Sequence, residues 1–189
     1  MSLRILGGAF KGRPLKSPQS SPTRPTQGIL RQAVFNICQS EINHARFLDL
    51  FAGSGAMGLE ALSRGASFAT FVEQNSSAAR CIRENIEILQ VQNRSALLTM
   101  DIFAALRQLS KRNAAFDIIY IDPPYEKATL VIHRVLQDLE KLSLIAPNGA
   151  IMIEESSQTD ETSYESATLK QNSVRRYGIA RLVHLSKSF

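Results

Sequence analysis

Long hydrophobic runs are absent from this chain of 189 residues, so the sequence contains no stretch that approaches the length of a membrane span. An apolar centre is also absent from the first residues, MSLRILGGAFKGR, where a secretory signal would need one. We therefore expect a cytoplasmic protein that has no contact with a membrane. The hydrophobic content of 44% and the charged content of 21% are ordinary for a globular chain of one domain.

Cysteine and histidine are scarce. Cys38 and Cys81 lie far apart, each in a helix-like apolar context, so we expect two buried free thiols and no disulfide. The three histidines, His44, His133 and His184, share no spacing that is typical of metal ligands. The sequence therefore predicts no metal site.

Acidic residues are absent from both ends of the chain. Residues 1–40 contain six basic residues and no acid, and residues 169–189 contain five basic residues and no acid. This asymmetry indicates a polyanionic partner, most simply nucleic acid, although a solvated basic surface explains the charges equally well. The basic residues near the N-terminus are Arg4, Lys11, Arg13, Lys16, Arg24 and Arg31.

The remaining pattern predicts an α/β fold. The first eighteen residues have the pattern of a β-hairpin around Gly7-Gly8, and a Ser/Pro loop over 19–26 ends at Thr26, which can cap a helix over 28–41. Amphipathic helices then alternate with apolar strands, which is typical of a parallel sheet buried on both faces. We therefore expect a Rossmann-like, mostly parallel seven-stranded sheet with helices on both faces and an N-terminal β-hairpin. The expected strands are 46–51, 68–73, 96–100, 116–121, 150–154, 164–169 and 179–185.

A glycine-rich segment follows the first of these strands. Residues 53–58, GSGAMG, match the G-x-G-x-x-G pattern, and Glu73 follows twenty residues after Gly53. Either a dinucleotide or S-adenosylmethionine fits such a loop. Asp49, however, would repel a pyrophosphate placed over the loop, whereas it would attract the sulfonium and ammonium groups of S-adenosylmethionine.

Acids at four successive strand ends favour the sulfonium cofactor. Asp49, Glu73, Asp101 and Asp122 all fall at carboxyl ends of expected strands, where doubly wound sheets bind ligands. Glu73 would bridge the ribose hydroxyls and Asp101 would accept from the adenine amino group. As alternatives, Asp101 and Glu73 could each merely cap a following helix. The expected cofactor-binding residues are Asp49, Phe51, Ala52, Gly53, Ser54, Gly55, Glu73, Gln74, Asp101, Ile102 and Thr26.

The tetrapeptide Asp122-Pro123-Pro124-Tyr125 follows the fourth strand and indicates the chemistry. Two prolines fix two φ angles and remove two backbone donors, so the Asp122 carboxylate and the Pro123 carbonyl remain as rigid acceptors. Such an edge can hold both hydrogens of an exocyclic amino group and leave its lone pair aimed at a methyl donor, while Tyr125 stacks on an extruded base. Asp122, Pro123, Pro124 and Tyr125 are the expected catalytic residues; a proline-rich turn without a catalytic role is the alternative.

The sequence resembles the bacterial small-subunit ribosomal RNA guanine-N2 methyltransferases of the RsmD type, within the class I S-adenosylmethionine-dependent enzymes. The tetrapeptide alone is shared with adenine-N6 methyltransferases, and the N-terminal motifs are the more specific part. One departure is QGIL over 27–30, which has a glycine and is less polar than is usual. The matching segments are RILGG (4–8), KGR (11–13), RPT (24–26), Arg31 with FN (35–36), FLDLFAGSG (47–55), FDIIYIDPPY (116–125) and YG (177–178).

The resemblance implies methyl transfer from S-adenosylmethionine to N2 of a guanine in 16S ribosomal RNA, free or within an assembled or assembling small subunit. We expect a monomer in which residues 1–26 form an RNA-contacting hairpin and linker and residues 27–189 form the methyltransferase domain. Arg4, Lys11, Arg13, Lys16, Arg24 and Arg31 would contact RNA. Three alternatives stay open: an adenine-N6 methyltransferase, an NAD-dependent oxidoreductase, and a non-catalytic RNA-binding factor.

Overall fold

A computed structural model describes residues 3–18, 25–124, 128–158 and 163–188. Among these residues, no helix combines the length and the hydropathy that crossing a membrane requires. The elements are α1 (Pro25–Ile37), β1 (Arg46–Leu50), α2 (Ala56–Ser63), β2 (Phe68–Val72), α3 (Ser76–Leu89), a 3-10 turn (Gln92–Arg94), β3 (Ser95–Leu98), α4 (Ile102–Lys111), β4 (Phe116–Ile121), α5 (Ala128–Lys141), β5 (Ile145–Ser156), β6 (Leu169–Tyr177) and β7 (Ala180–Lys187).

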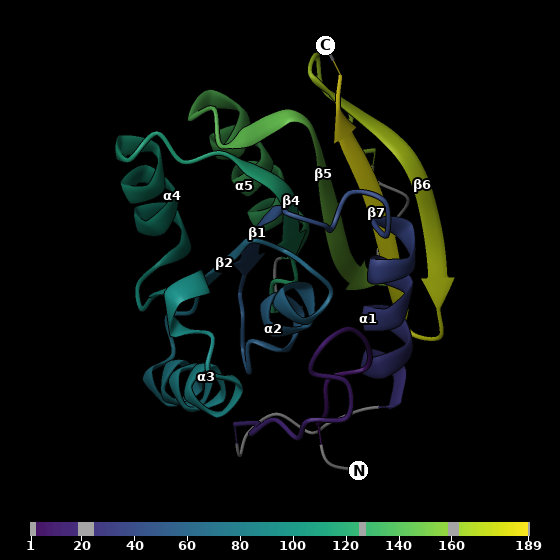
Figure 1. Cartoon of the computed structure of the whole chain (residues 1–189). Helices are drawn as coiled ribbons and strands as arrows, with labels where there is room; N and C mark the ends of the chain where they lie inside the picture. The colour runs from purple at the N-terminus through teal and green to yellow at the C-terminus, as the bar shows by residue number, and fades with distance from the viewer. Residues whose placement is uncertain (1–2, 19–24, 125–127, 159–162, 189) are drawn as a thin grey trace.

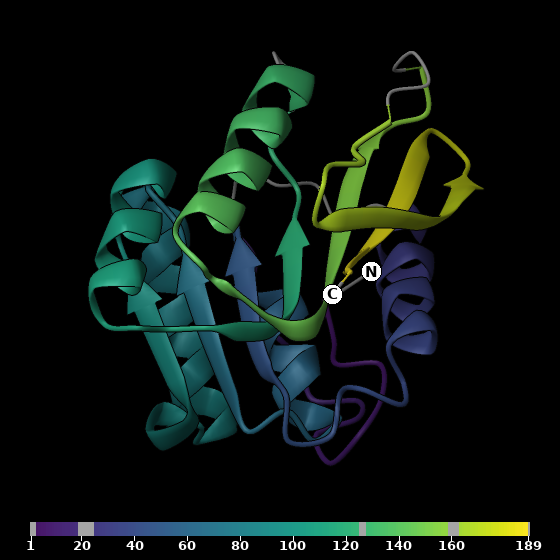
Figure 2. The same ribbon diagram turned by 90° about the horizontal axis from the view of Figure 1, so that it is seen from above.

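The strands form the predicted seven-stranded, mostly parallel sheet in the order β3-β2-β1-β4-β5-β7-β6 (Figures 1 and 2). The strands β1 to β5 run parallel, while β7 pairs antiparallel with both β5 and β6. Because the chain proceeds outward from β1 to β3 and then returns to β4 on the other side of β1, the order reverses between β1 and β4. Doubly wound sheets bind their ligands beyond the carboxyl ends of the strands at such a reversal.

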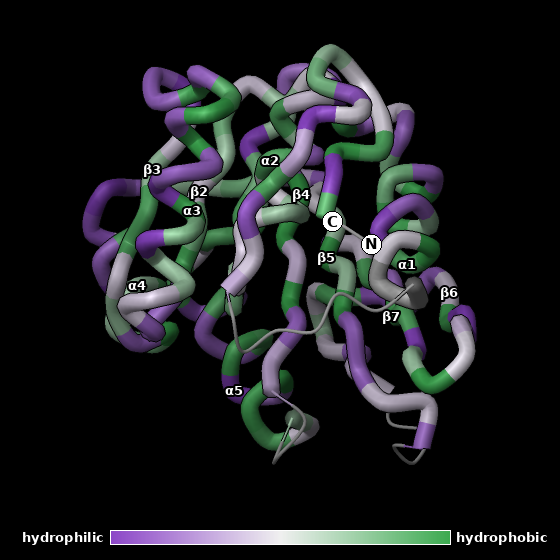
Figure 3. The backbone as a smooth tube through the Cα atoms, turned by 90° about the horizontal axis from the view of Figure 1, so that it is seen from below, coloured by the Kyte–Doolittle hydropathy of each residue, from purple (hydrophilic) through white to green (hydrophobic). Residues whose placement is uncertain are grey.

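Helices cover both faces of the sheet, as predicted. One core joins α1, α2, α3 and the N-terminal segment to the face that carries Phe47, Ile118 and Tyr120. The second core joins α4 and α5 to the opposite face, which carries Leu48 and Ile119. In Figure 3 the helices alternate between hydrophobic and hydrophilic segments, as amphipathic helices packed on a sheet do. The thiols of Cys38 and Cys81 are buried and free, as the sequence predicts.

Several boundaries differ from the sequence-based prediction: α1 ends at Ile37 and not at residue 41, and β5 begins at Ile145 and not at residue 150. The helix α1 begins at Pro25 and not near residue 28, because proline is well tolerated in the first turn, where its missing N–H has no intrahelical partner. The strand predicted over 164–169 is wrong: β6 begins at Leu169 and continues to Tyr177, and its burial alternates only weakly because it is the edge strand of the sheet. Tyr164 precedes β6 but is buried, so this aromatic residue resembled part of a strand in the sequence.

The N-terminal segment (residues 3–16) folds back on itself as a short antiparallel loop. The amide of Ile5 donates to the carbonyl of Arg13 at 3.0 Å, and the amide of Leu15 donates to the carbonyl of Leu3 at 2.8 Å. The pairing amounts to one β-bridge, between Arg4 and Pro14, and not to two regular strands. Ile5 and Leu15 are buried in the core beside α1, so the segment depends on the domain for its apolar contacts.

Candidate active site

The register of the sheet places several acids at one edge. Leu50 of β1 lies beside Val72 of β2 and Ile121 of β4, so Glu73 and Asp122 follow at the same level. Asp49 lies within β1, two residues before that level, and is paired with Phe71 and Tyr120. The carboxyl ends of β1, β2 and β4 therefore surround the start of the glycine-rich loop.

The loop between β1 and α2 owes its shape to three residues in the left-handed region. Phe51 has φ 63°, Gly53 has φ 55° and Gly55 has φ 76°. A bulky residue at positive φ is an outlier that persists where surrounding structure requires it, and such outliers gather at ligand sites. A Cβ on Gly53 would meet no atom within 4 Å, whereas one on Gly55 would contact Ile82 and Phe71. The backbone at Gly53 is thus open to close approach by a ligand.

Asp49 is buried beneath this loop, with 1% of its surface exposed. Its Oδ2 accepts a hydrogen bond from the amide of Gly58, in the first turn of α2, at 2.9 Å. Burial raises the pKa of Asp49 to about 8; the Gly58 amide opposes this shift, and the charge of Glu73 adds to it. A cation placed beside the loop would therefore stabilise the charged form of this buried carboxyl, which has no cationic partner among the described residues.

We expect Asp49→Asn to stabilise the ligand-free protein more at pH 8 than at pH 5. The folded pKa lies above the unfolded value of 3.8, so the parent loses stability as the pH rises from about 4 to about 8. Asparagine does not titrate and can still accept from Gly58. Urea unfolding should show the advantage of the variant growing by about 2–4 kcal/mol between pH 5 and pH 8. An advantage that does not vary with pH would show that Asp49 is already ionised in the folded state.

Glu73 ties the loop to the neighbouring strand. Its Oε2 accepts from the amide of Gly53 at 2.8 Å, and its Oε1 accepts from the amide of Asn75 at 2.7 Å. The cap of α3 is Asn75, whose side chain accepts from Ser77 and Ala78, so Glu73 does not cap that helix. Asp101, in contrast, does cap a helix: its Oδ1 accepts from the amides of Phe103 and Ala104 at the start of α4.

Substitutions can separate the cap at Asp101 from a cofactor role. We expect Glu73→Ala and Asp101→Ala each to weaken S-adenosylmethionine binding by about 1–3 kcal/mol, which is the scale for losing hydrogen bonds to a charged group. Asp101→Asn retains the cap, because its amide oxygen can accept the same two bonds. Isothermal titration should therefore show weak cofactor binding in Asp101→Asn, while its melting temperature should match that of the parent. Parent-like affinity in all three variants would remove both acids from the cofactor site.

The tetrapeptide at the end of β4 is described through Pro124. Asp122 is partly exposed, Pro123 is buried and Pro124 is exposed. The pKa of Asp122 is raised well above its ordinary value by burial, and the charges of Glu154 and Asp49 raise it further. Tyr125 and Arg24 lie outside the described residues, as does the side chain of Thr26. Of the remaining cofactor candidates, Gln74 is exposed beside Glu73, and Ile102 is buried at the start of α4.

Two residues at this edge escaped the sequence-based prediction. Ile153 of β5 lies beside Ile121, so Glu154 stands at the level of Asp122. The hydroxyl of Tyr120 donates a hydrogen bond to Oε2 of Glu154. Both residues fall inside apolar strand runs, where nothing but the charge of Glu154 itself could have marked them.

The basic N-terminal residues divide into exposed and buried ones. Arg4, Lys11, Arg13 and Lys16 are exposed, as RNA contacts require. Arg31 is not: its side chain is buried, and its Nη2 donates to the carbonyl of Arg4 at 2.6 Å. The expectation that Arg31 contacts RNA is therefore corrected. It faces the core because α1 packs that side against the N-terminal segment and α2.

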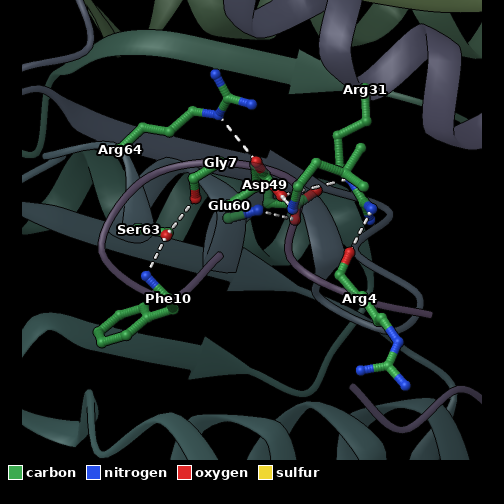
Figure 4. Close-up of polar contacts among 10 residues, drawn as sticks. Arg4, Gly7, Phe10, Arg31, Asp49, Glu60, Ser63 and Arg64 are labelled. Atoms are coloured by element: carbon green, nitrogen blue, oxygen red, sulfur yellow. Dashed lines mark hydrogen bonds and ion pairs between the residues drawn. The ribbon is translucent and has the colours of Figure 1, made fainter. Parts of the chain in front are cut away.

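Three buried polar side chains fasten the N-terminal segment to the domain, and Figure 4 shows two of them, Glu60 and Ser63. Glu60 of α2 accepts from the amide of Leu6 at 2.7 Å, and it also lies within 3.6 Å of the Arg31 guanidinium. Ser63, the last residue of α2, accepts through its hydroxyl from the amide of Phe10 at 2.9 Å. The third side chain is that of Asn85, in α3.

Asn85 of α3 links the same segment to the glycine-rich loop. Its Oδ1 accepts from the amide of Lys16 at 2.7 Å, and its Nδ2 donates to the carbonyls of Lys16 and Ser54 at 2.9 and 3.0 Å. The basic segment and the loop after β1 are therefore held by one buried amide. The N-terminal segment is in this way fixed relative to the carboxyl edge of the sheet.

This architecture, with a glycine loop at the sheet reversal and an Asp-Pro-Pro turn beside it, defines a methyltransferase of the Rossmann-like class. A family model described as "Conserved hypothetical protein 95" matches residues 3–186, and the chain belongs to that family, the RsmD family. It is 34% identical over 147 residues to "Ribosomal RNA small subunit methyltransferase D" of Escherichia coli (strain K12), covering 78% of this chain and 68% of that protein.

Solved structures agree with the assignment. "Putative methyltransferase yhhF from Escherichia coli" superposes with a TM-score of 0.87 at 26% identity and covers 100% of this chain and 99% of that one. A more distant structure shares the fold alone: "SMU.776, a putative methyltransferase complexed with SAH" has a TM-score of 0.72 at 16% identity and covers 87% of this chain and 50% of that one.

Proposed function

We propose that this protein transfers a methyl group from S-adenosylmethionine to the exocyclic N2 amino group of a guanine in 16S ribosomal RNA. The observation that carries the proposal is the position of Asp122-Pro123-Pro124 directly after β4, beside the glycine loop at the reversal of the sheet. The relative named "Ribosomal RNA small subunit methyltransferase D" supports the choice of a ribosomal substrate.

The residues around the loop fit S-adenosylmethionine better than a dinucleotide. Gly53 leaves its backbone open, and Asp49 is a buried carboxyl with no cationic side chain bonded to it among the described residues. A cationic ligand complements that carboxyl, whereas a pyrophosphate would be repelled by it. Glu73 and Asp101 would hold the ribose and the adenine. When bound, the cofactor supplies an electrophilic methyl group, and the distant structure complexed with SAH has the same fold.

The protein contributes orientation and a place for the proton. The Asp122 carboxylate and the Pro123 carbonyl accept the two hydrogens of the target amine, which leaves the nitrogen lone pair free for in-line attack. The nitrogen becomes acidic once it carries the methyl group and then releases one proton. Because its pKa is raised, Asp122 is a stronger base than a surface aspartate and can hold that proton.

The proposal includes the partner and the division of the chain. Residues 1–26 contact RNA through Arg4, Lys11, Arg13, Lys16 and Arg24, and residues 27–189 bind the cofactor and the target base. The protein would act as a monomer in the cytoplasm without a metal, on free ribosomal RNA or on a small subunit during or after assembly.

Nucleoside analysis tests the reaction directly. Small-subunit RNA from a strain that lacks this gene is incubated with the protein and labelled S-adenosylmethionine, then digested and separated. We expect label in N2-methylguanosine, and primer extension should stop at one position only after treatment. Label in N6-methyladenosine would establish the adenine alternative. Titration that detects NAD and not S-adenosylmethionine would favour an oxidoreductase, and cofactor binding without transfer to any RNA would favour a binding factor.

Neutralising the exposed N-terminal charges should weaken RNA binding selectively. In the variant Lys11→Ala/Arg13→Ala/Lys16→Ala, we expect lower affinity at low salt and a log–log salt slope reduced by up to about 0.7–0.9 per lost contact. Cofactor affinity and melting temperature should barely change, since all three side chains are exposed. Binding measured by fluorescence anisotropy across a salt series gives the slope.

A matched control removes three exposed charges on the other face of the sheet. Arg107, Lys111 and Arg112 belong to α4 or follow it directly, and all are exposed. Their replacement by alanine changes the net charge equally and should leave the slope nearer the parent value. If both triple variants lose the same RNA affinity and the same salt slope, charge acts at long range and the N-terminal segment makes no specific contact with RNA.

A further inference from the structure

Two consecutive glutamates near the carboxyl end of β5 have very different surroundings. Glu155 is fully paired: Arg181 donates to its Oε1 at 2.7 and 2.9 Å, and the hydroxyl of Tyr164 donates to its Oε2 at 2.7 Å. For Glu154, the hydroxyl of Tyr120 provides the one hydrogen bond that the described residues offer, and none of their cationic side chains forms an ion pair with it. Glu154 is nevertheless 9% exposed and follows the fully buried Ile151–Ile153.

The position of Glu154 sets it beside the proposed target amine. Side chains two residues apart on a strand share a face, so Glu154 shares the face of Met152 and Asp122 shares the face of Tyr120. Both faces belong to the same core, the one that includes α1 and α2. Since Ile121 and Ile153 are paired in register, the two carboxyls leave the sheet side by side. Burial raises the pKa of Glu154, and its charge in turn raises the pKa of Asp122.

A buried carboxylate without a cation is costly for the fold, so this one is better explained by a ligand than by stability. The ligand that would suit two adjacent carboxylates is a row of neighbouring hydrogen-bond donors. Guanine offers such a row on its Watson–Crick edge, where the N1–H lies next to the two hydrogens of the N2 amine. Adenine offers an amine next to N1, but its N1 carries a lone pair that a carboxylate would repel.

We propose that Glu154 accepts the N1–H of the target guanine and thereby makes the enzyme select guanine over adenine. The inference rests on the proposed guanine-N2 methyl transfer and adds the residue that reads the base. Tyr120 is a positioning residue, because its hydroxyl fixes Oε2 of Glu154 and leaves Oε1 to face the base. Asp122 and the Pro123 carbonyl then hold the amine.

The test replaces the target guanine with 2-aminopurine, which keeps the N2 amine but has a bare nitrogen at N1. The target nucleotide, once mapped, is introduced into the RNA by splinted ligation, and the RNA is assembled with ribosomal proteins if free RNA is not methylated. We expect the parent to prefer guanine in kcat/KM by about 10²–10⁴-fold, because a site built to bind a donor rejects an analogue without it. In Glu154→Gln, the amide can donate to the bare N1, so the preference should narrow to within about tenfold.

Two controls separate base reading from folding. Glu155→Gln alters the neighbouring acid, which is paired with Arg181; it should cost stability but keep the parent preference. Loss of the O6 group in 2-aminopurine affects every variant alike, so the change of preference isolates N1. The pH dependence of kcat/KM gives a second readout. In Glu154→Gln its acid limb should move to lower pH, because the charge of Glu154, which raises the pKa of Asp122, is removed.

The outcomes distinguish this inference from the function on which it rests. If the parent forms no N2-methylguanosine, the proposed function fails. If the parent does form N2-methylguanosine and Glu154→Gln retains both the full preference and the parent pH profile, only the role of Glu154 is overturned. A narrowed preference in Glu155→Gln as large as that in Glu154→Gln would also overturn it, since a general loss of packing would then explain both.

Discussion

Asp122→Ala should lower the rate of methyl transfer by about 10²–10⁴-fold and leave cofactor affinity nearly unchanged, because its proposed work is to orient an amine for attack. Alanine leaves the Pro123 carbonyl as the one acceptor at the end of β4. The amine could then rotate, and its lone pair would face the methyl group only part of the time. Asp122→Asn should lose less, since the amide oxygen can still accept one of the two hydrogens.

Single-turnover methylation with saturating cofactor measures this effect without product release. Asp117→Ala is the matched control, because Asp117 belongs to the same strand and accepts through Oδ2 from the amide of Arg46 at 2.7 Å, at the opposite end of the sheet. It should retain the parent rate. Near-normal turnover in Asp122→Ala would refute the acceptor edge, whereas loss of cofactor binding in that variant would move Asp122 into the cofactor site.

The sheet and its ligand edge could be predicted because they depend on local patterns. The ends of β2 and β4 are marked by the change from apolar residues to Glu73 and Asp122, and parallel strands bring such ends together whatever the rest of the chain does. The glycine loop is likewise a local signal. The positions of these residues follow from sequence alone, while their roles toward cofactor and base stay predictions that the proposed variants test.

The residues that were missed depend on contacts between distant segments. Arg31 looks like one more cation in a basic N-terminus, and its burial follows only once α1 is packed against α2, where Glu60 lies twenty-nine residues further on. Glu154 looks like the polar end of a strand, and its nearness to Asp122 depends on β5 pairing with β4 in one register. Neither pairing leaves a periodic pattern in the sequence.

The contacts of Glu60 join α2 to α1 and to the N-terminal segment. This glutamate is fully buried, yet it is surrounded by partners: Arg64 donates through Nε to its Oε1 at 2.9 Å, while Leu6 and Arg31 approach its Oε2. Burial lowers the pKa of Arg31, but the charge of Glu60 opposes that shift. Arg31 therefore depends on Glu60, because without that carboxylate its charge would be left uncompensated in the core between α1, α2 and the N-terminal segment.

Glu60→Ala should thus destabilise the protein by about 3–5 kcal/mol, the scale for leaving one partner of a buried ion pair uncompensated. For a chain of this length, the melting temperature should fall by about 6–20 °C. Glu60→Gln keeps an acceptor for the Leu6 amide, so its melting temperature should lie between those of the parent and of Glu60→Ala. Trypsin should also cut after Lys11 and Lys16 sooner in Glu60→Ala, because the N-terminal segment has lost a hydrogen bond to α2. The matched control is Glu84→Ala, which breaks an exposed pair between Glu84 and Lys16 and should leave the melting temperature almost unchanged. If Glu60→Ala and Glu84→Ala have the same melting temperature, the contacts of Glu60 do not hold the N-terminal segment in place. Asn85 and the apolar contacts of Ile5 and Leu15 must then hold it.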